Sequence, residues 1–109
     1  MTVRNAVEAA WSIETAVQWT PEIPAGGQCN VTTVLIHDIY GGQILKTALP
    51  EVDHYYNEIN GMRVDFTDSQ FAEPIRYDDT PADRAEAMKC VTPKEYDVLR
   101  KNFFAQLGT

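Results

Sequence analysis

The segment from His54 to Thr67 limits the fold more narrowly than any other part of the sequence. Two alternating runs, HYYNEI and MRVDFT, flank the pair Asn60-Gly61. Asn-Gly is favoured in a two-residue type I′ turn, because both turn positions require a positive φ angle. We therefore predict a β-hairpin in which Ile59 pairs with Met62.

The register of this hairpin gathers polar side chains on one face. Alternation places His54 and Asp65 on the same face, diagonally across the two strands and within reach of each other. The register sets Tyr56 directly opposite Asp65, and it sets Glu58 opposite Arg63 as a cross-strand ion pair. The other face carries Tyr55, Asn57, Ile59, Met62, Val64 and Phe66.

Two helices and a strand are predicted before the hairpin. Apolar residues recur at helical spacing over Val3 to Val17, and again from Cys29 until Gly41-Gly42 ends the second helix. The stretch from Thr20 to Gly27, TPEIPAGG, contains the prolines and glycines of a loop. The run QILKTAL, from Gln43 to Leu49, predicts a strand inside the sheet.

Two further helices are predicted after the hairpin. Thr80-Pro81 offers an N-cap followed by proline at the first helical position, which predicts a helix to about Cys90. Thr92-Pro93-Lys94-Glu95 is a capping box with proline at the first position, and it predicts a helix that ends at Gly108. We expect the two helices to pack as a hairpin, and Cys90 to be packed rather than reactive.

Length and composition fit one domain spanning residues 1–109. The chain has 109 residues, of which 44% are hydrophobic, and this suits a single core. We predict an α+β fold with N-terminal helices, a small antiparallel sheet containing the Asn-Gly hairpin, and a C-terminal helix pair.

The charge balance argues against two classes of partner. The 16 acidic and 9 basic side chains give a net charge of -7, which repels phosphate backbones and anionic lipids. We therefore expect no nucleic-acid or membrane partner, and an acidic mimic of nucleic acid is the weaker alternative. No apolar run is long enough to cross a bilayer and no signal peptide is visible, so we predict a cytoplasmic location.

Cys29 is the main candidate for chemistry. It opens the second predicted helix, where unpaired amides and the helix dipole stabilise a thiolate, and the same amides can hold an oxyanion. The alternative is a small apolar residue packed beneath the helix start. Cys29 and Cys90 are far apart and lack a CxxC partner, so both are expected to be free thiols.

His54 and Asp65 complete a candidate triad with Cys29. A carboxylate bonded to one ring nitrogen fixes the tautomer, and the other nitrogen then exchanges a proton with the thiol. The alternatives are a solvent-exposed His54 and an Asp65 bonded to Tyr56. His37 lies too far along the helix from Cys29 to pair with it. These residues lack the short spacings of metal sites, so no metal or cofactor is predicted.

Several short motifs occur in a specific order along the chain. They are Gly27-Gln28-Cys29, Gly41-Gly42-Gln43-Ile44, His54-Tyr55-Tyr56-Asn57, Val64-Asp65-Phe66-Thr67 and Gln70-Phe71. In this order they resemble the YunG-like family of small bacterial proteins over the range Trp11 to Phe71. The family name implies no substrate.

A cysteine that opens a helix, followed by a histidine and an acidic residue on successive strands, resembles the core of papain-like thiol enzymes. These include transglutaminase-like and NlpC/P60 proteins. The resemblance implies a minimal papain-like core in which Cys29 is the nucleophile, His54 the base and Asp65 the orienting acid. Gln28 is a candidate for oxyanion or substrate binding, although its place directly beside the cysteine departs from the papain pattern.

Two functions follow from these observations. The first is a cysteine-dependent hydrolase or acyl-transferase that acts on an amide, isopeptide or thioester of a small molecule or peptide through an acyl-enzyme. The second is a non-catalytic acidic module that binds or inhibits a host protein. A subunit that only packs within a larger assembly is the third alternative.

Overall fold

The computed structural model describes residues 2–108, and within them the chain forms four α-helices and one four-stranded antiparallel sheet. The helices are α1 (Val3–Ala10), α2 (Cys29–Tyr40), α3 (Arg84–Met88) and α4 (Pro93–Gln106). The strands are β1 (Gln43–Ala48), β2 (Asp53–Ile59), β3 (Met62–Val64) and β4 (Thr80–Ala82), in the spatial order β3-β2-β1-β4. A short 3-10 helix, η1, spans Asp68–Gln70. The predicted α+β class is confirmed.

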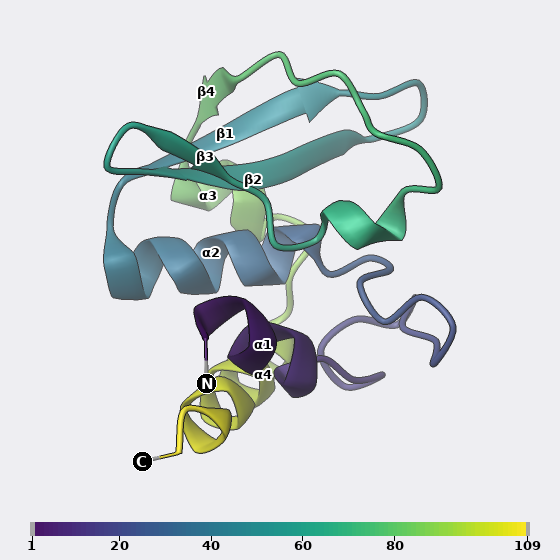
Figure 1. The fold of residues 1–109 in the computed structure, drawn as a ribbon, viewed down its shortest axis with the longest axis vertical. Coiled ribbons are helices and arrows are strands. Elements are labelled where there is room, and N and C mark those ends of the chain that lie inside the picture. Colours follow the sequence, from purple (N-terminus) through teal and green to yellow (C-terminus); the bar gives the residue numbers. More distant parts are fainter. Residues whose placement is uncertain (1, 109) are drawn as a thin grey trace.

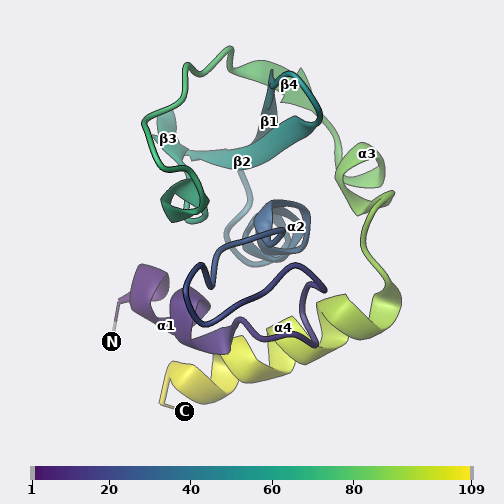
Figure 2. The same ribbon diagram turned by 90° about the vertical axis from the view of Figure 1, so that its right-hand side faces the viewer.

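Helix α2 is the central element of the fold. It lies between the sheet on one side and the pair α1 and α4 on the other (Figures 1 and 2). Both sides of α2 are therefore buried, which agrees with its high content of fully buried residues.

Two clusters of buried side chains fill the space on either side of α2. The larger joins α1, α2 and α4, and the smaller joins α2 to the sheet and α3. Trp11 belongs to the larger cluster, and its indole N–H donates to Thr32 Oγ1 on α2 at 2.9 Å. This bond satisfies the one polar atom of a large side chain that is only 6% exposed.

The predicted hairpin is present with the predicted register. Asn60 and Gly61 have φ angles of 53° and 77°, and Ile59 pairs with Met62. Strand β3 ends at Val64, so the expected strand pairing of Tyr56 with Asp65 does not form. Asp65 instead lies in the segment that leaves the sheet, where its side chain is free to turn toward β2.

The first helix is shorter than predicted. It ends at Ala10, and Trp11 takes an extended conformation with φ -69° and ψ 144°. The reason lies in Ser12 and Thr15, whose hydroxyl groups bond nearby backbone atoms in a turn. Such local bonds compete with helix continuation, and the apolar spacing up to Val17 did not reveal them.

The prediction of a helix starting at Thr80-Pro81 is wrong. Thr80–Ala82 forms the edge strand β4, with Pro81 opposite Leu45 of β1. Proline is tolerated at a sheet edge, and the helix α3 begins only after Asp83, whose side chain accepts from the Glu86 amide. The helix from Pro93 is confirmed, including the capping box of Thr92 and Glu95.

The C-terminal helices do not pack as a hairpin. Helix α3 packs mainly on α2, whereas α4 packs on α1 and α2. Cys90 follows α3 and is exposed, so the prediction that it is packed is also wrong. The expected Glu58–Arg63 ion pair is replaced, because Arg63 binds Asp79 through Nε at 2.9 Å and Nη2 at 2.6 Å.

Among residues 2–108, none of the helices combines the length and apolar character needed to cross a bilayer.

The entry into β1 yields a test of the fold. Gly42 has a φ of +77°, and a Cβ there would lie 2.1 Å from the Glu58 carbonyl oxygen of β2. Gly41 has a similar φ of +76° but open space around it. We expect Gly41→Ala to lower the free energy of unfolding by about 1–2 kcal/mol through φ strain alone. Gly42→Ala should cost at least about 2 kcal/mol more, because the strands must separate.

Urea denaturation of the two variants measures this difference. Equal losses at both positions would contradict the described contact between Gly42 and β2.

Candidate functional site

Cys29 is the first residue of α2 and is 9% exposed. Its thiol donates to Asn30 Oδ1, with a sulfur–oxygen distance of 3.2 Å. The other end of the Asn30 amide, Nδ2, donates to the Ala87 carbonyl of α3 at 2.9 Å. The side chain next to the sulfur is thus anchored to a second helix.

His54 and Asp65 form a buried pair. The distance from His54 Nε2 to Asp65 Oδ2 is 2.7 Å, and the two side chains are 2% and 5% exposed. Two aromatic rings enclose the imidazole: Tyr56 stacks at a centroid distance of 5.8 Å, and Phe71 meets it edge-on at 4.8 Å. The alternative of a solvent-exposed His54 does not hold.

Asp65 accepts hydrogen bonds from three residues. Besides His54, the Tyr77 hydroxyl donates to Oδ2 at 2.8 Å, and Thr67 donates to Oδ1 through its amide at 3.1 Å and its hydroxyl at 3.2 Å. Tyr56 bonds Asp79 instead of Asp65. Four bonds on one carboxylate fix its position and stabilise its negative charge.

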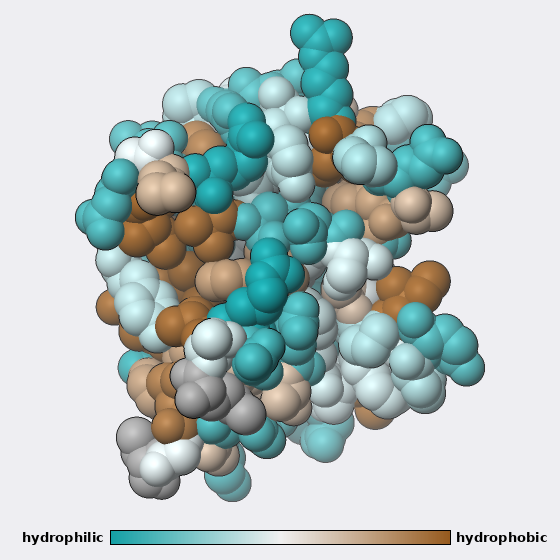
Figure 3. All heavy atoms as spheres, in the orientation of Figure 1, coloured by the Kyte–Doolittle hydropathy of each residue, from teal (hydrophilic) through white to brown (hydrophobic). Residues whose placement is uncertain are grey.

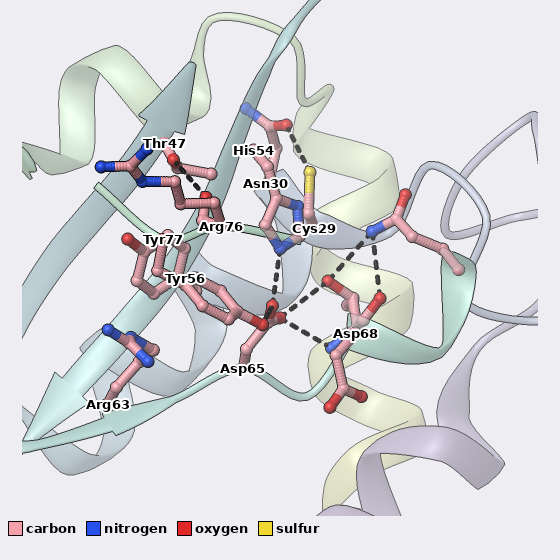
Figure 4. A network of polar contacts seen from close by, with 12 residues as sticks. Cys29, Asn30, Thr47, His54, Tyr56, Arg63, Asp65, Asp68, Arg76 and Tyr77 are labelled. Atoms are coloured by element: carbon pink, nitrogen blue, oxygen red, sulfur yellow. Dashed lines mark hydrogen bonds and ion pairs between the residues drawn. The ribbon is translucent and has the colours of Figure 1, made fainter. Parts of the chain in front are cut away.

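The three candidate residues come together at one end of α2. In Figure 4 the imidazole lies between the Cys29 sulfur and the Asp65 carboxylate. Cys29 is close enough to His54 for hydrogen-bonding and Coulombic interactions that raise the pKa of the imidazole. Sequence positions 25 residues apart are therefore neighbours, because β2 begins beside the start of α2.

The electrostatics of the pair favour a charged imidazole. Burial acts to lower the pKa of His54, but the bond to Asp65 and the interaction with Cys29 outweigh it and raise the pKa to about 9. Burial acts to raise the pKa of Asp65, but the hydrogen bond from His54 and its positive charge outweigh burial. The pKa of Asp65 therefore lies below its usual value. At neutral pH the pair is an imidazolium beside a carboxylate.

A cavity of about 290 Å³ opens onto this group. Cys29 and His54 line it together with Phe71 and the exposed Cys90. A ligand of small-molecule size therefore has access to the sulfur. Both thiols are free, as predicted.

Gln28 is fully buried, and its side chain is engaged within the protein. Its Oε1 accepts from the Thr15 hydroxyl at 2.8 Å, and its Nε2 donates to the Ser12 carbonyl at 3.4 Å. These bonds tie the segment before α2 to the start of the helix. Gln28 does not line the cavity, whereas Gln18 does. The oxyanion role of Gln28 stays a prediction.

Three site residues were not found from the sequence. Asn30 bonds the sulfur, and Tyr77 and Thr67 bond Asp65. Thr67 lies on the predicted polar face of the hairpin, which was a usable signal. Tyr77 comes from a loop after the hairpin, and no spacing in the sequence indicates that this loop returns to the sheet.

Among residues 2–108 there is no group of three His, Cys, Asp or Glu side chains that would hold a metal ion. His37 is half-buried on α2, and its Nδ1 has no hydrogen-bond partner among the described residues.

The comparisons with known proteins place the whole chain in one family. A family model described as "YunG protein" matches residues 1–108. The chain is also 42% identical, over 107 residues, to a Bacillus subtilis (strain 168) protein called "Uncharacterized protein YunG". This match covers 98% of the chain and 93% of the relative. No solved structure matches the chain.

The buried pair makes stability depend on pH. His54 has a folded-state pKa of about 9 against an ordinary 6.5, so its stabilisation is complete below 6.5 and is lost as pH rises through about 9. The Asp65 contribution is present above its ordinary 3.8 and is lost at lower pH. Asp65→Asn should therefore lower the free energy of unfolding by on the order of 3 kcal/mol near pH 6.

Urea denaturation measures the free energy of unfolding of wild type and Asp65→Asn from about pH 6 to about pH 10. The difference between the two proteins should become smaller as the pH rises. The matched control is Asp97→Asn on the exposed face of α4. Its free energy of unfolding should differ from that of the wild type by a small amount that does not change with pH. If the difference in free energy of unfolding between wild type and Asp65→Asn stays constant or grows with pH, the result would contradict a charged pair.

Proposed function

The chain belongs to the YunG family, and we propose that it is a cysteine-dependent hydrolase or acyl-transferase acting on an amide, isopeptide or thioester. The observation that carries the proposal is the buried His54–Asp65 bond of 2.7 Å beside a thiol that lines an open cavity. Strongly shifted pKa values gather at functional sites, and an imidazole held charged beside a thiol is the arrangement that thiol catalysis requires.

The proposed reaction forms and breaks a thioester at Cys29. The thiolate attacks the acyl carbonyl and forms a carbon–sulfur bond, the bond from the carbonyl carbon to the substrate nitrogen or sulfur breaks, and the His54 imidazolium gives its proton to the departing amine or thiol. His54 then takes a proton from water or another acceptor nucleophile, which attacks the thioester. The carbon–sulfur bond breaks, and the thiolate beside the imidazolium is restored. Asp65 holds the ring in one orientation during both steps.

The oxyanion formed in each step needs hydrogen-bond donors. Backbone amides of the first turn of α2 are the proposed donors, because they are next to Cys29 and at the positive end of the helix dipole. Gln28 is retained as a second proposed contributor. The arrangement of helix-opening cysteine, strand histidine and following aspartate supports the further proposal of a minimal papain-like core.

The proposed setting is the cytoplasm, since free thiols persist in a reducing compartment. The proposed substrate is a small molecule or a peptide, without nucleic acid or membrane as a partner.

Selective alkylation tests the role of the sulfur. Exposure alone favours reaction at Cys90, because Cys29 is only 9% exposed. If the imidazolium beside Cys29 stabilises its thiolate, iodoacetamide near pH 6 should label Cys29 at least about tenfold faster than Cys90. His54→Ala should remove that advantage, and the control His37→Ala should keep it.

Peptide mass spectrometry of time points gives both rates. Faster labelling of Cys90 than of Cys29 would contradict the proposed catalytic role of Cys29. The non-catalytic acidic binding module would then be the better-supported function.

A trapped acyl-enzyme tests turnover. With p-nitrophenyl acetate, intact mass should show one added acetyl group on Cys29, which then disappears as water hydrolyses the thioester. Asp65→Asn should slow the loss of the acetyl group by about 10- to 1000-fold, because His54 loses the carboxylate that orients it and stabilises the imidazolium formed when it takes the proton. A permanent acetyl group in the wild type would exclude hydrolysis, and acetyl groups spread over lysines would exclude Cys29 as the nucleophile.

A further inference from the structure

We infer that the cavity beside Cys29 selects substrates whose acyl group is apolar and carries no negative charge. This inference rests on the proposed function and concerns the substrate class of the same site. It follows from what forms the walls of the cavity and from which charges are found there.

Apolar side chains from separate parts of the chain line the cavity. Val17 comes from the segment before α2, and Val52 from the connection between β1 and β2. They are 73% and 65% exposed, yet both line the cavity. Leu49, Phe71 and Val91 add half-buried apolar surface to the same cavity. Hydrophobic side chains also reach the surface at this edge of the molecule, the right-hand edge in Figure 3.

Exposed valines in a cavity that also contains a reactive thiol have a physical consequence. Each leaves apolar surface in water, and an apolar ligand that enters the cavity removes that surface from water. The gain grows with the apolar area that the ligand covers, so a ring or a branched chain binds more tightly than a small acyl group. A short acyl group such as acetyl gains little from the same walls.

The charges in the cavity exclude anionic substrates. Asp53 and Glu95 line it, and no Lys or Arg between residues 2 and 108 does. The positive charge of His54 is already balanced by Asp65 at 2.7 Å. Lys46 lies 3.9 Å from Asp53 but binds Glu86 more closely, and among residues 2–108 no Lys, Arg or His forms an ion pair with Glu95. A carboxylate or phosphate on the substrate would therefore meet net repulsion. Phosphate-bearing carrier thioesters are disfavoured, and neutral or amine-bearing apolar amides fit.

A set of matched alkylating reagents tests this inference without needing turnover. The reagents are iodoacetamide, N-benzyl iodoacetamide and N-(4-carboxybenzyl) iodoacetamide. The protein carries Cys90→Ala, so that intact mass reports Cys29 alone, and each rate is divided by the rate with glutathione. We expect the benzyl reagent to react about tenfold faster than iodoacetamide, and the carboxybenzyl reagent to lose most of that advantage.

Variants identify the groups responsible. Val17→Ser and Val52→Ser should each lower the ratio of benzyl to iodoacetamide rates several-fold. The controls Ile23→Ser and Met62→Ser are at residues 48% and 70% exposed that do not line the cavity, and they should keep the ratio. Glu95→Gln retains the oxygen that caps α4 and should raise the carboxybenzyl rate, whereas the exposed control Glu51→Gln should not.

The outcomes separate the two proposals. Fast labelling of Cys29 by all three reagents, with no preference for the benzyl group, overturns the substrate class and leaves the cysteine enzyme intact. A preference for the carboxybenzyl reagent overturns it as well. A Cys29 that reacts no faster than glutathione with every reagent overturns the proposed function itself, and this inference with it.

Discussion

The ion pair between His54 and Asp65 is the interaction on which the rest of the site depends. A histidine that is 2% exposed has a strong tendency to be neutral, because burial removes the water that stabilises its charge. The carboxylate at 2.7 Å, together with the nearby Cys29, reverses that tendency and raises the pKa to about 9. The bond to Asp65 also fixes the orientation of the ring.

The fold keeps water away from this pair with a loop that returns to the sheet. Between η1 and β4 the chain crosses the polar face of the hairpin, and side chains of three strands hold it there. Thr47 of β1 donates to the Arg76 carbonyl (Figure 4). Tyr56 of β2 and Arg63 of β3 both donate to the Asp79 carboxylate. Tyr77 from the same loop bonds Asp65. The loop therefore covers the Asp65 carboxylate and also supplies one of its hydrogen-bond donors.

Sequence reasoning succeeded where a local rule decides the structure. Asn60-Gly61 fixed the hairpin, and the Thr92–Glu95 capping box fixed the start of α4. It failed where pairing with a distant segment outweighs a local preference. Thr80-Pro81 has the residues of a helix start, yet Thr80–Ala82 pairs with β1 as an edge strand. The same limit applies to the site. The proximity of His54 and Asp65 follows from the alternation of side chains along the hairpin. The hydrogen bonds of Asn30 to Cys29 and of Tyr77 to Asp65 depend on tertiary packing.

The most direct test of the central claim is the protonation of His54 itself. Nitrogen-15 NMR of the imidazole, assigned with the His54→Ala variant, follows the ring charge across pH in the folded protein. A charged pair predicts a midpoint near 9, with the imidazolium present at neutral pH. A midpoint at or below the ordinary 6.5 would show a neutral ring and contradict the account.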